Sequence, residues 1–110
     1  MPTAAYNFDI SSFFTSWLVT MCDDSQYPDG SFADVSPDLG IGSGATAWGD
    51  ASFQCADHMY EVYGDKEIIS QHYAELTRYM DFLHAHSNNY IAHVGGSEDW
   101  LDLGGGADSR

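Results

Sequence analysis

The strongest helical signal in this chain lies in residues 48–86, which read WGDASFQCADHMYEVYGDKEIISQHYAELTRYMDFLHAH. Apolar residues recur there at intervals of three and four, which is typical of helices that bury one stripe. The pattern predicts one helix over about 48–63 and another over 66–86. Gly64 is expected to end the first helix and Asp65 to cap the second. Because this joint is so short, the two helices should form an antiparallel hairpin.

A third amphipathic helix is predicted upstream of the hairpin, over about residues 9–24. Asp9 is its expected N-cap. Its apolar residues keep the same helical spacing: Ile10, Phe13, Phe14, Trp17, Leu18, Met21 and Cys22. The sequence therefore predicts an all-α chain, whose helical stripes should meet at six residues: Phe13, Trp17, Phe53, Tyr60, Leu76 and Met80.

The segment between the predicted helices is rich in glycine and is predicted to be a long loop. It begins with a turn at Tyr27–Gly30 and contains a GxGxxA string at Gly40–Ala45. A dinucleotide site would need a strand before that string and a helix after it. Because no strand is predicted there, we interpret the string as part of the loop. Beyond the hairpin, Tyr90–Val94 is expected to form a short strand or an extended arm.

The composition narrows the possible classes of function. The 110 residues include 3 Lys and Arg against 17 Asp and Glu, which gives a formal net charge of −14. A polyanion repels phosphate, so neither nucleic acid nor an anionic membrane is expected as a partner. No run approaches the roughly 18 apolar residues of a membrane span, and the first residues do not resemble a signal peptide. A content of 44% hydrophobic residues is too high for an acidic disordered tail.

The cysteines and histidines, which often bind metals, are interpreted here as structural residues. Cys22 and Cys55 fall within helical patterns and are expected to be buried thiols. His84 and His86 are two positions apart on a predicted helix, so they point to different faces and do not hold one ion together. We interpret them as helix-end histidines, which the helix dipole favours. A cluster with histidines of other helices is left as the alternative, and neither a metal nor another cofactor is predicted.

Two pairs of a tryptophan and a carboxylate suggest the chemistry of a binding site. Trp48 and Asp50 lie where the helix over 48–63 begins, and Asp99 and Trp100 lie in the glycine-rich C-terminal segment. The apolar face of a sugar stacks on indole, and sugar hydroxyls donate to carboxylates. A carbohydrate is therefore the predicted ligand. The structural alternative is that Asp50 complements the helix dipole while Trp48 packs against the first turn.

Eight short pieces of the sequence follow one another at specific spacings. They are Asn7–Asp9, Phe13–Leu18, Pro28–Ser31, Val35–Asp38, Ala47–Ala51, Tyr63–Lys66, Arg78–Leu83 and Asp99–Leu101. In this order they resemble the bacterial α-L-rhamnosidases that have an (α/α)6-barrel catalytic domain. The resemblance implies that residues 1–110 are part of such a catalytic domain. It further implies an all-α, three-helix piece of a six-hairpin toroid with long glycine-rich loops.

The resemblance also implies a function, which is the removal of terminal α-L-rhamnose from glycosides or polysaccharides with inversion. It assigns Trp48, Asp50, Asp99 and Trp100 to the sugar pocket, with Asp38 as a further candidate. The general acid of the family lies in a Cys-Pro-x-Arg-x-Glu-like motif that has no counterpart in this sequence, and its general base is not matched either. We therefore expect pocket walls without the catalytic pair, so the chain would be inactive without the remainder of the parent domain. The alternative is a stand-alone acidic helical module that binds carbohydrate or protein without catalysis.

Overall fold

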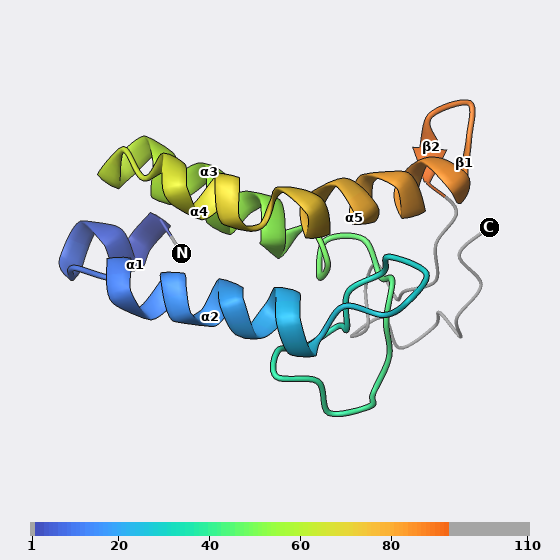
Figure 1. The fold of residues 1–110 in the computed structure, drawn as a ribbon, viewed down its shortest axis with the longest axis horizontal. Helices are drawn as coiled ribbons and strands as arrows, with labels where there is room; N and C mark the ends of the chain where they lie inside the picture. The colour runs from blue at the N-terminus through green and yellow to red at the C-terminus, as the bar shows by residue number, and fades with distance from the viewer. Residues whose placement is uncertain (1, 93–110) are drawn as a thin grey trace, which may run out of the picture.

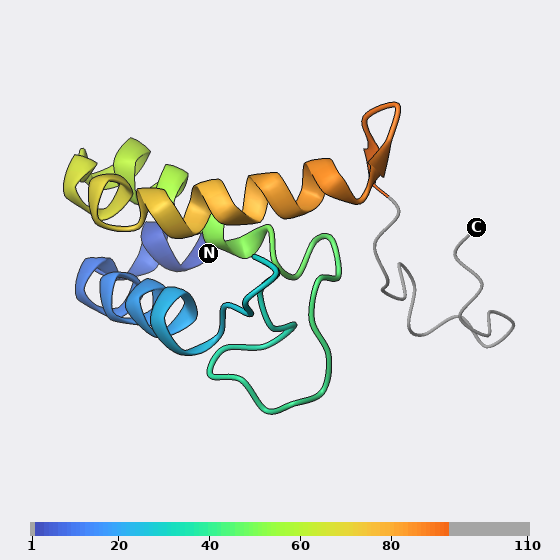
Figure 2. The same ribbon diagram turned by 45° about the vertical axis from the view of Figure 1, so that its right-hand side comes forward.

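Five helices make up most of the computed structural model, which describes residues 2–92. They are α1 (Pro2–Asn7), α2 (Ser11–Asp24), α3 (Ala51–Tyr63), α4 (Lys66–Gln71) and α5 (Tyr73–Ala85). In Figures 1 and 2, α1 and α2 lie on one side of the molecule, and α3, α4 and α5 lie on the other. Within this part of the chain the all-α prediction is confirmed, and none of the helices is long and apolar enough to cross a membrane.

Helices α2 and α3 begin later than the sequence predicts. The N-cap of α2 is Ile10, not Asp9, and Ile10 makes no capping hydrogen bond through its side chain. Asp9 instead accepts a hydrogen bond from Ser11 N at 3.1 Å. Helix α3 starts at Ala51, because residues 46–50 form turns. The short α1 was not predicted, since its six residues are too few to show a helical period.

The joint between α3 and α4 follows the prediction. Gly64 adopts the left-handed conformation with a φ of 67°, and its N–H donates to Tyr60 O at 2.8 Å. Asp65 accepts a hydrogen bond from Ile68 N at 3.1 Å, which is the expected capping contact. The chain therefore reverses within two residues, and α4 packs against α3.

The helix predicted over 66–86 is divided at His72 into α4 and α5, which corrects that prediction. Neither proline nor glycine marks the break, so the sequence carries no signal for it. The backbone hydrogen bonds almost continue across it, because His72 N donates to Ile68 O at 3.3 Å and Leu76 N donates to His72 O at 3.0 Å. The break is thus a local distortion of one helical path, and the side chains on both sides of it reach the core.

A small antiparallel hairpin follows α5, with β1 at Ser87–Asn88 and β2 at Ile91–Ala92. The predicted short strand is therefore present over Ile91–Ala92, whereas Tyr90 belongs to the turn. The last two residues of that prediction, 93 and 94, lie outside the described residues.

The hydrophobic core lies between the two groups of helices and includes Phe32 from the connection between α2 and α3. Its buried members are Leu18, Met21, Cys22, Phe32, Cys55, Ala56, Met59, Ile68, Leu76, Tyr79 and Phe82. Both cysteines are free and buried, as predicted, and burial raises the pKa of each thiol to about 12.

Three of the six residues expected to meet in the core lie largely at the surface, with exposed fractions of 65% for Phe13, 43% for Tyr60 and 54% for Met80. The other three do contribute, since Leu76 is buried and two partly buried rings pack against the core, those of Trp17 and Phe53. These three residues were wrongly assigned because the sequence does not fix the rotation of each helix about its axis. Neighbouring helical positions point about 100° apart, so a predicted buried stripe that is wrong by one position includes exposed side chains.

The connection between α2 and α3 is irregular but anchored to the helices. Two isolated antiparallel β-bridges pair residues within this connection, Gln26 with Phe32 and Ala33 with Ser43. The predicted turn at Tyr27–Gly30 is closed by a hydrogen bond of 2.9 Å between its ends. Gln26 Nε2 donates to the carbonyl of Glu75 in α5 at 2.8 Å. Figures 1 and 2 show this connection at the end of the molecule where α2 ends and α3 begins.

Candidate functional site

Three of the five predicted sugar-binding residues lie in the described part of the chain, and all three belong to the connection between α2 and α3. Trp48 and Asp50 stand directly before α3, and Asp38 stands earlier in the same connection. Asp99 and Trp100 lie outside the described residues. The structure therefore describes the part of the predicted site that this connection forms.

Asp50 occupies the N-cap position of α3, but its side chain makes no capping hydrogen bond to that helix. Its two carboxylate oxygens accept elsewhere. Oδ2 accepts from Ala47 N at 3.1 Å, and Oδ1 accepts from the hydroxyl of Tyr79 at 3.0 Å. Ala47 has a φ of 69°, which is uncommon for a residue with a side chain. The half-buried carboxylate thus closes the turn before α3 and links that turn to α5.

Tyr79 is the partner that the sequence analysis missed. Its side chain is fully buried, and its ring lies 5.2 Å from that of Phe32 and 5.6 Å from that of Phe53, measured between centroids. Burial and then the hydrogen bond with Asp50 raise the pKa of the Tyr79 hydroxyl, so it remains a donor at neutral pH. A buried tyrosine hydroxyl needs a polar partner, which was the available signal, but helical spacing alone does not say which residue provides it.

Trp48 stands apart from the hydrophobic core. Its side chain is 50% exposed, and it is not among the apolar residues that pack against the buried cluster. Its position two residues before the fixed carboxylate of Asp50 leaves an open aromatic surface near hydrogen-bond acceptors. Such a combination can stack the apolar face of a sugar while carboxylates bind its hydroxyls.

Asp38 is held by two short hydrogen bonds within the connection. Its Oδ1 accepts from Gly40 N and its Oδ2 from the hydroxyl of Tyr27, both at 2.7 Å. These two donors, with the Gly40 N–H first, lower the pKa of Asp38. The carboxylate is therefore a fixed, charged acceptor, and it also shapes the loop around itself.

A third carboxylate in the connection, that of Asp34, was not singled out from the sequence. Its Oδ1 accepts from Ala45 N at 3.2 Å, and its backbone N–H donates to Gly42 O at 2.9 Å. The charge of Asp34 is also one of the smaller causes that raise the pKa of the Tyr79 hydroxyl, after burial and Asp50. No sequence pattern separates it from other loop acids, because its position depends on how the connection folds.

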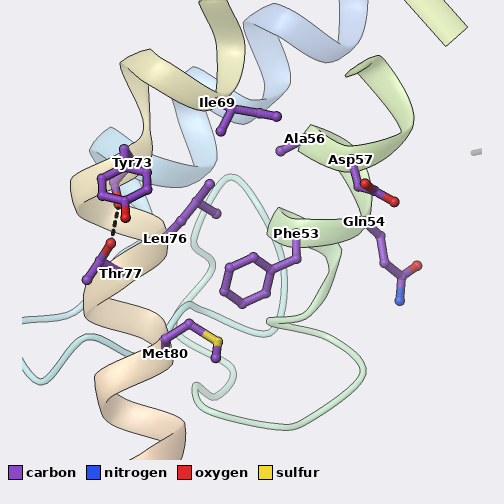
Figure 3. Close-up of a pocket in the computed structure, with 9 residues that line it drawn as sticks. All are labelled: Phe53, Gln54, Ala56, Asp57, Ile69, Tyr73, Leu76, Thr77 and Met80. Atoms are coloured by element: carbon purple, nitrogen blue, oxygen red, sulfur yellow. Dashed lines mark hydrogen bonds between the residues drawn. The ribbon is translucent and has the colours of Figure 1, made fainter. Parts of the chain in front are cut away.

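An apolar groove lies elsewhere, between α3 on one side and α4 and α5 on the other (Figure 3). It has a volume of about 570 Å³, and Phe53, Leu76 and Met80 point toward its interior. Its lining consists of Phe53, Gln54, Ala56, Asp57, Ile69, Tyr73, Leu76, Thr77 and Met80. None of the three predicted sugar-binding residues that the structure describes lines this groove, and its chemistry suits apolar side chains better than a sugar.

The histidines lie where the sequence placed them, at the end of α5. His84 belongs to the last turn and His86 is the C-cap, with Nδ1 2.8 Å from the carbonyl of Phe82. Among residues 2–92, no three or more side chains of His, Cys, Asp or Glu gather in a way that could hold a metal ion.

Comparison with known proteins finds matches over most of the chain. Residues 1–110 match the family described as bacterial alpha-L-rhamnosidase 6 hairpin glycosidase domain. An alpha-L-rhamnosidase of Streptomyces avermitilis is 35% identical over 103 residues, which cover 93% of this chain and 10% of that protein. An alpha-L-rhamnosidase of Formosa agariphila is 31% identical over 101 residues, which cover 91% of this chain and 11% of that protein. The chain thus spans about a tenth of the length of these relatives, and no solved structure matches it.

Proposed function

This chain belongs to the family of bacterial α-L-rhamnosidase six-hairpin glycosidase domains, and from this we propose that it is part of a glycoside hydrolase that removes terminal α-L-rhamnose. The chain supplies walls of the sugar pocket through Trp48, Asp50 and Asp38, joined by Asp99 and Trp100. The rest of the six-hairpin domain supplies the remaining walls. The reaction proceeds with inversion at the anomeric carbon.

The observation that carries this proposal is the arrangement at the start of α3. There an exposed indole, that of Trp48, stands two residues before a carboxylate that is fixed by two donors. A carboxylate offers about four lone-pair sites, of which Ala47 N and the Tyr79 hydroxyl use one each. Within residues 2–92 no other donor bonds to the Asp50 carboxylate, so its remaining sites can accept from sugar hydroxyls, while the methyl group and apolar face of rhamnose stack on the indole.

The pocket carboxylates suit binding better than proton donation. An inverting hydrolase needs one carboxylic acid to protonate the leaving oxygen, and that acid requires a raised pKa. The pKa of Asp38 is lowered by the Gly40 N–H and the Tyr27 hydroxyl, so Asp38 is ionised at neutral pH. Both oxygens of Asp50 are engaged as acceptors. We therefore assign the general acid and the general base to parts of the parent domain outside this sequence.

The proposal is tested in an enzyme in which this chain replaces the 103 matched residues of the Streptomyces avermitilis relative. The substrate is an aryl α-L-rhamnoside, and NMR identifies the anomer of rhamnose that is released first. We expect turnover with β-L-rhamnose as the first product. Asp50→Asn and Trp48→Ala should each raise KM about ten- to a hundredfold, because a hydrogen bond to a charged group or a stacking contact is lost.

The matched control is Asp81→Asn on α5, whose exposed carboxylate makes no hydrogen bond within the described residues. Its KM should stay unchanged. A folded chimera without turnover would overturn the proposal. Turnover with unchanged KM in both pocket variants would mean that Trp48 and Asp50 have structural roles only and do not contact the sugar.

A further inference from the structure

The position of Asp50 is not explained by the helix that it precedes. An aspartate at an N-cap normally accepts a hydrogen bond from a first-turn N–H of its own helix. Asp50 makes no such bond, and its backbone has helical angles, with φ of −60° and ψ of −17°. Its carboxylate instead accepts from Ala47 N and from the hydroxyl of Tyr79, a residue 29 positions further along the chain. The orientation of the carboxylate is therefore set by the turn before α3 and by α5, and not by α3 itself.

Tyr79 is rigid enough to set that orientation. Its side chain is fully buried, and three aromatic rings surround it. The ring of Phe82 is stacked on it at 6.1 Å with an angle of 13°, the ring of Phe53 is stacked at 5.6 Å with an angle of 30°, and Phe32 meets it edge-on at 5.2 Å. Such packing allows few alternative positions for the ring, so the hydroxyl oxygen has one location.

The absence of a side chain at Gly49 independently supports the contact between Tyr79 and Asp50. A Cβ atom at position 49 would lie 2.5 Å from the Tyr79 hydroxyl oxygen and 2.8 Å from Cζ. These distances are shorter than any real side chain tolerates. Gly49 does not adopt a left-handed backbone, so the glycine is needed for space and not for its conformational freedom. The chain thus keeps a gap beside Asp50 that the hydroxyl of Tyr79 fills.

We propose that Tyr79 is a positioning residue for the sugar site, which acts through Asp50 without touching the substrate. Its hydroxyl holds Oδ1 of Asp50 so that the free lone pairs of the carboxylate face the pocket. Loss of that hydroxyl leaves the carboxylate held by Ala47 N alone, which loosens its orientation and weakens its contact with a sugar hydroxyl. This inference rests on the proposed function, because it requires Asp50 to contact the sugar.

The experiment is a double-mutant cycle in the chimeric enzyme described above, with the aryl α-L-rhamnoside as substrate. Tyr79→Phe keeps the ring and removes only the hydroxyl. We expect it to raise KM about five- to tenfold while kcat changes less than about twofold, since the lost contact serves binding. In the Asp50→Asn background, Tyr79→Phe should have no further effect on KM, because the group through which it acts is already altered.

The matched control is Tyr73→Phe on the same helix, whose exposed hydroxyl has no hydrogen-bond partner among residues 2–92. It should leave KM unchanged. If Tyr79→Phe lowers only the melting temperature, or raises KM equally with and without the Asp50 carboxylate, Tyr79 is a core residue and the inference is wrong. If Asp50→Asn itself leaves KM unchanged, the proposed role of Asp50 fails together with the inference.

A second measurement on the 110-residue chain keeps the inference testable even if a variant of the chimera fails to fold. The carboxyl carbon resonance of Asp50 in the NMR spectrum reports its hydrogen bonds directly. Tyr79→Phe should shift this resonance, whereas Tyr73→Phe should not. An Asp50 resonance that is identical in Tyr79→Phe and the unsubstituted chain would overturn the inference.

Discussion

The hydroxyl of Tyr27 donates a hydrogen bond of 2.7 Å to Asp38 Oδ2 within the connection between α2 and α3. The second oxygen of the same carboxylate accepts from Gly40 N. The Gly40 N–H and the Tyr27 hydroxyl lower the pKa of Asp38, and the hydrogen bond to Asp38 raises the pKa of Tyr27. The stability of the connection should therefore depend on pH. In acid the Asp38 carboxylate becomes protonated, and in alkali the Tyr27 hydroxyl loses its proton, so the hydrogen bond between them weakens in both cases.

We expect stability to fall in acid, partly through Asp38. Its pKa is lower in the folded chain than its ordinary value of 3.8, so its contribution is present above that value and is lost as pH falls through the folded pKa. Tyr27→Phe removes one of the two donors and should reduce the difference in unfolding free energy between about pH 7 and about pH 3. Urea unfolding at both pH values measures it, with Tyr73→Phe as the control. An equal acid dependence in all three proteins would contradict this prediction.

Gly49→Ala should destabilise the chain by about 1–3 kcal/mol, because the new Cβ would collide with the buried Tyr79. Gly40→Ala is the comparison. Its Cβ would meet nothing within 4 Å, so only its positive φ of 68° makes it unfavourable, at about 1 kcal/mol. Combining Gly49→Ala with Tyr79→Phe should recover part of the loss, since the hydroxyl oxygen is the nearest atom. Urea unfolding gives all of these values, and a double variant less stable than Gly49→Ala would argue against the collision.

Cys22 and Cys55 should react slowly with a thiol reagent while the chain is folded. Burial raises the pKa of both to about 12, and only the thiolate is nucleophilic. In urea both should react at the rate of an ordinary cysteine, whose pKa is near 8.5. The measurement is the rate of modification against urea concentration. Rapid reaction of either thiol in the absence of urea would mean that its surroundings open readily.

Helical periodicity predicted the parts of this fold that depend on local sequence. The prediction of the joint at Gly64 and Asp65 was correct because each residue has one dominant local role there. Glycine ends a helix in the left-handed conformation, and aspartate caps the start of the next helix. The break at His72 was missed because no helix-breaking residue marks it. The face that each helix buries was only partly predicted, since a broad apolar surface is compatible with more than one rotation.

The candidate site shows the same division between local and tertiary information. Trp48 and Asp50 could be singled out because two informative residue types stand almost side by side in the sequence. The contact between Asp50 and Tyr79 could not, because it joins residues on different elements and requires the gap at Gly49. Asp34 was missed for a similar reason, since the bridge between Ala33 and Ser43 brings its surroundings together.

The apolar groove beside α3 should make the isolated chain bind a hydrophobic dye or self-associate. Its lining includes Met80 and Tyr73, which are 54% and 67% exposed. Monomeric proteins rarely leave such surfaces uncovered. Met80→Gln should lower dye fluorescence more than Phe8→Gln, because Phe8 is equally apolar and 72% exposed but does not line the groove. Weak dye binding together with a cooperative melting transition of the monomer would contradict this prediction, because the exposed groove would then neither bind the dye nor cause self-association.

The 110-residue chain alone should not hydrolyse an aryl α-L-rhamnoside. Inversion needs an acid and a base about 6.5–9.5 Å apart, on opposite sides of the bond that breaks. Glu61 in α3 and Glu67 in α4 are exposed and stand close in sequence to the joint between these helices. Figure 1 shows this joint at the opposite end of α3 from the connection that carries Asp50.

The Glu75 carboxylate, on α5, pairs with Arg78 at 3.5 Å. The measurement is release of the aryl group by chain purified free of host glycosidases, beside the chimeric enzyme as positive control. Activity that copurifies with the chain and disappears in Asp50→Asn would overturn this prediction. Loss of such activity in Glu98→Gln would identify that residue, which lies outside the described part, as a substitute acid or base. An inactive chain beside an active chimera would agree with an acid and a base in the segments that the relative provides.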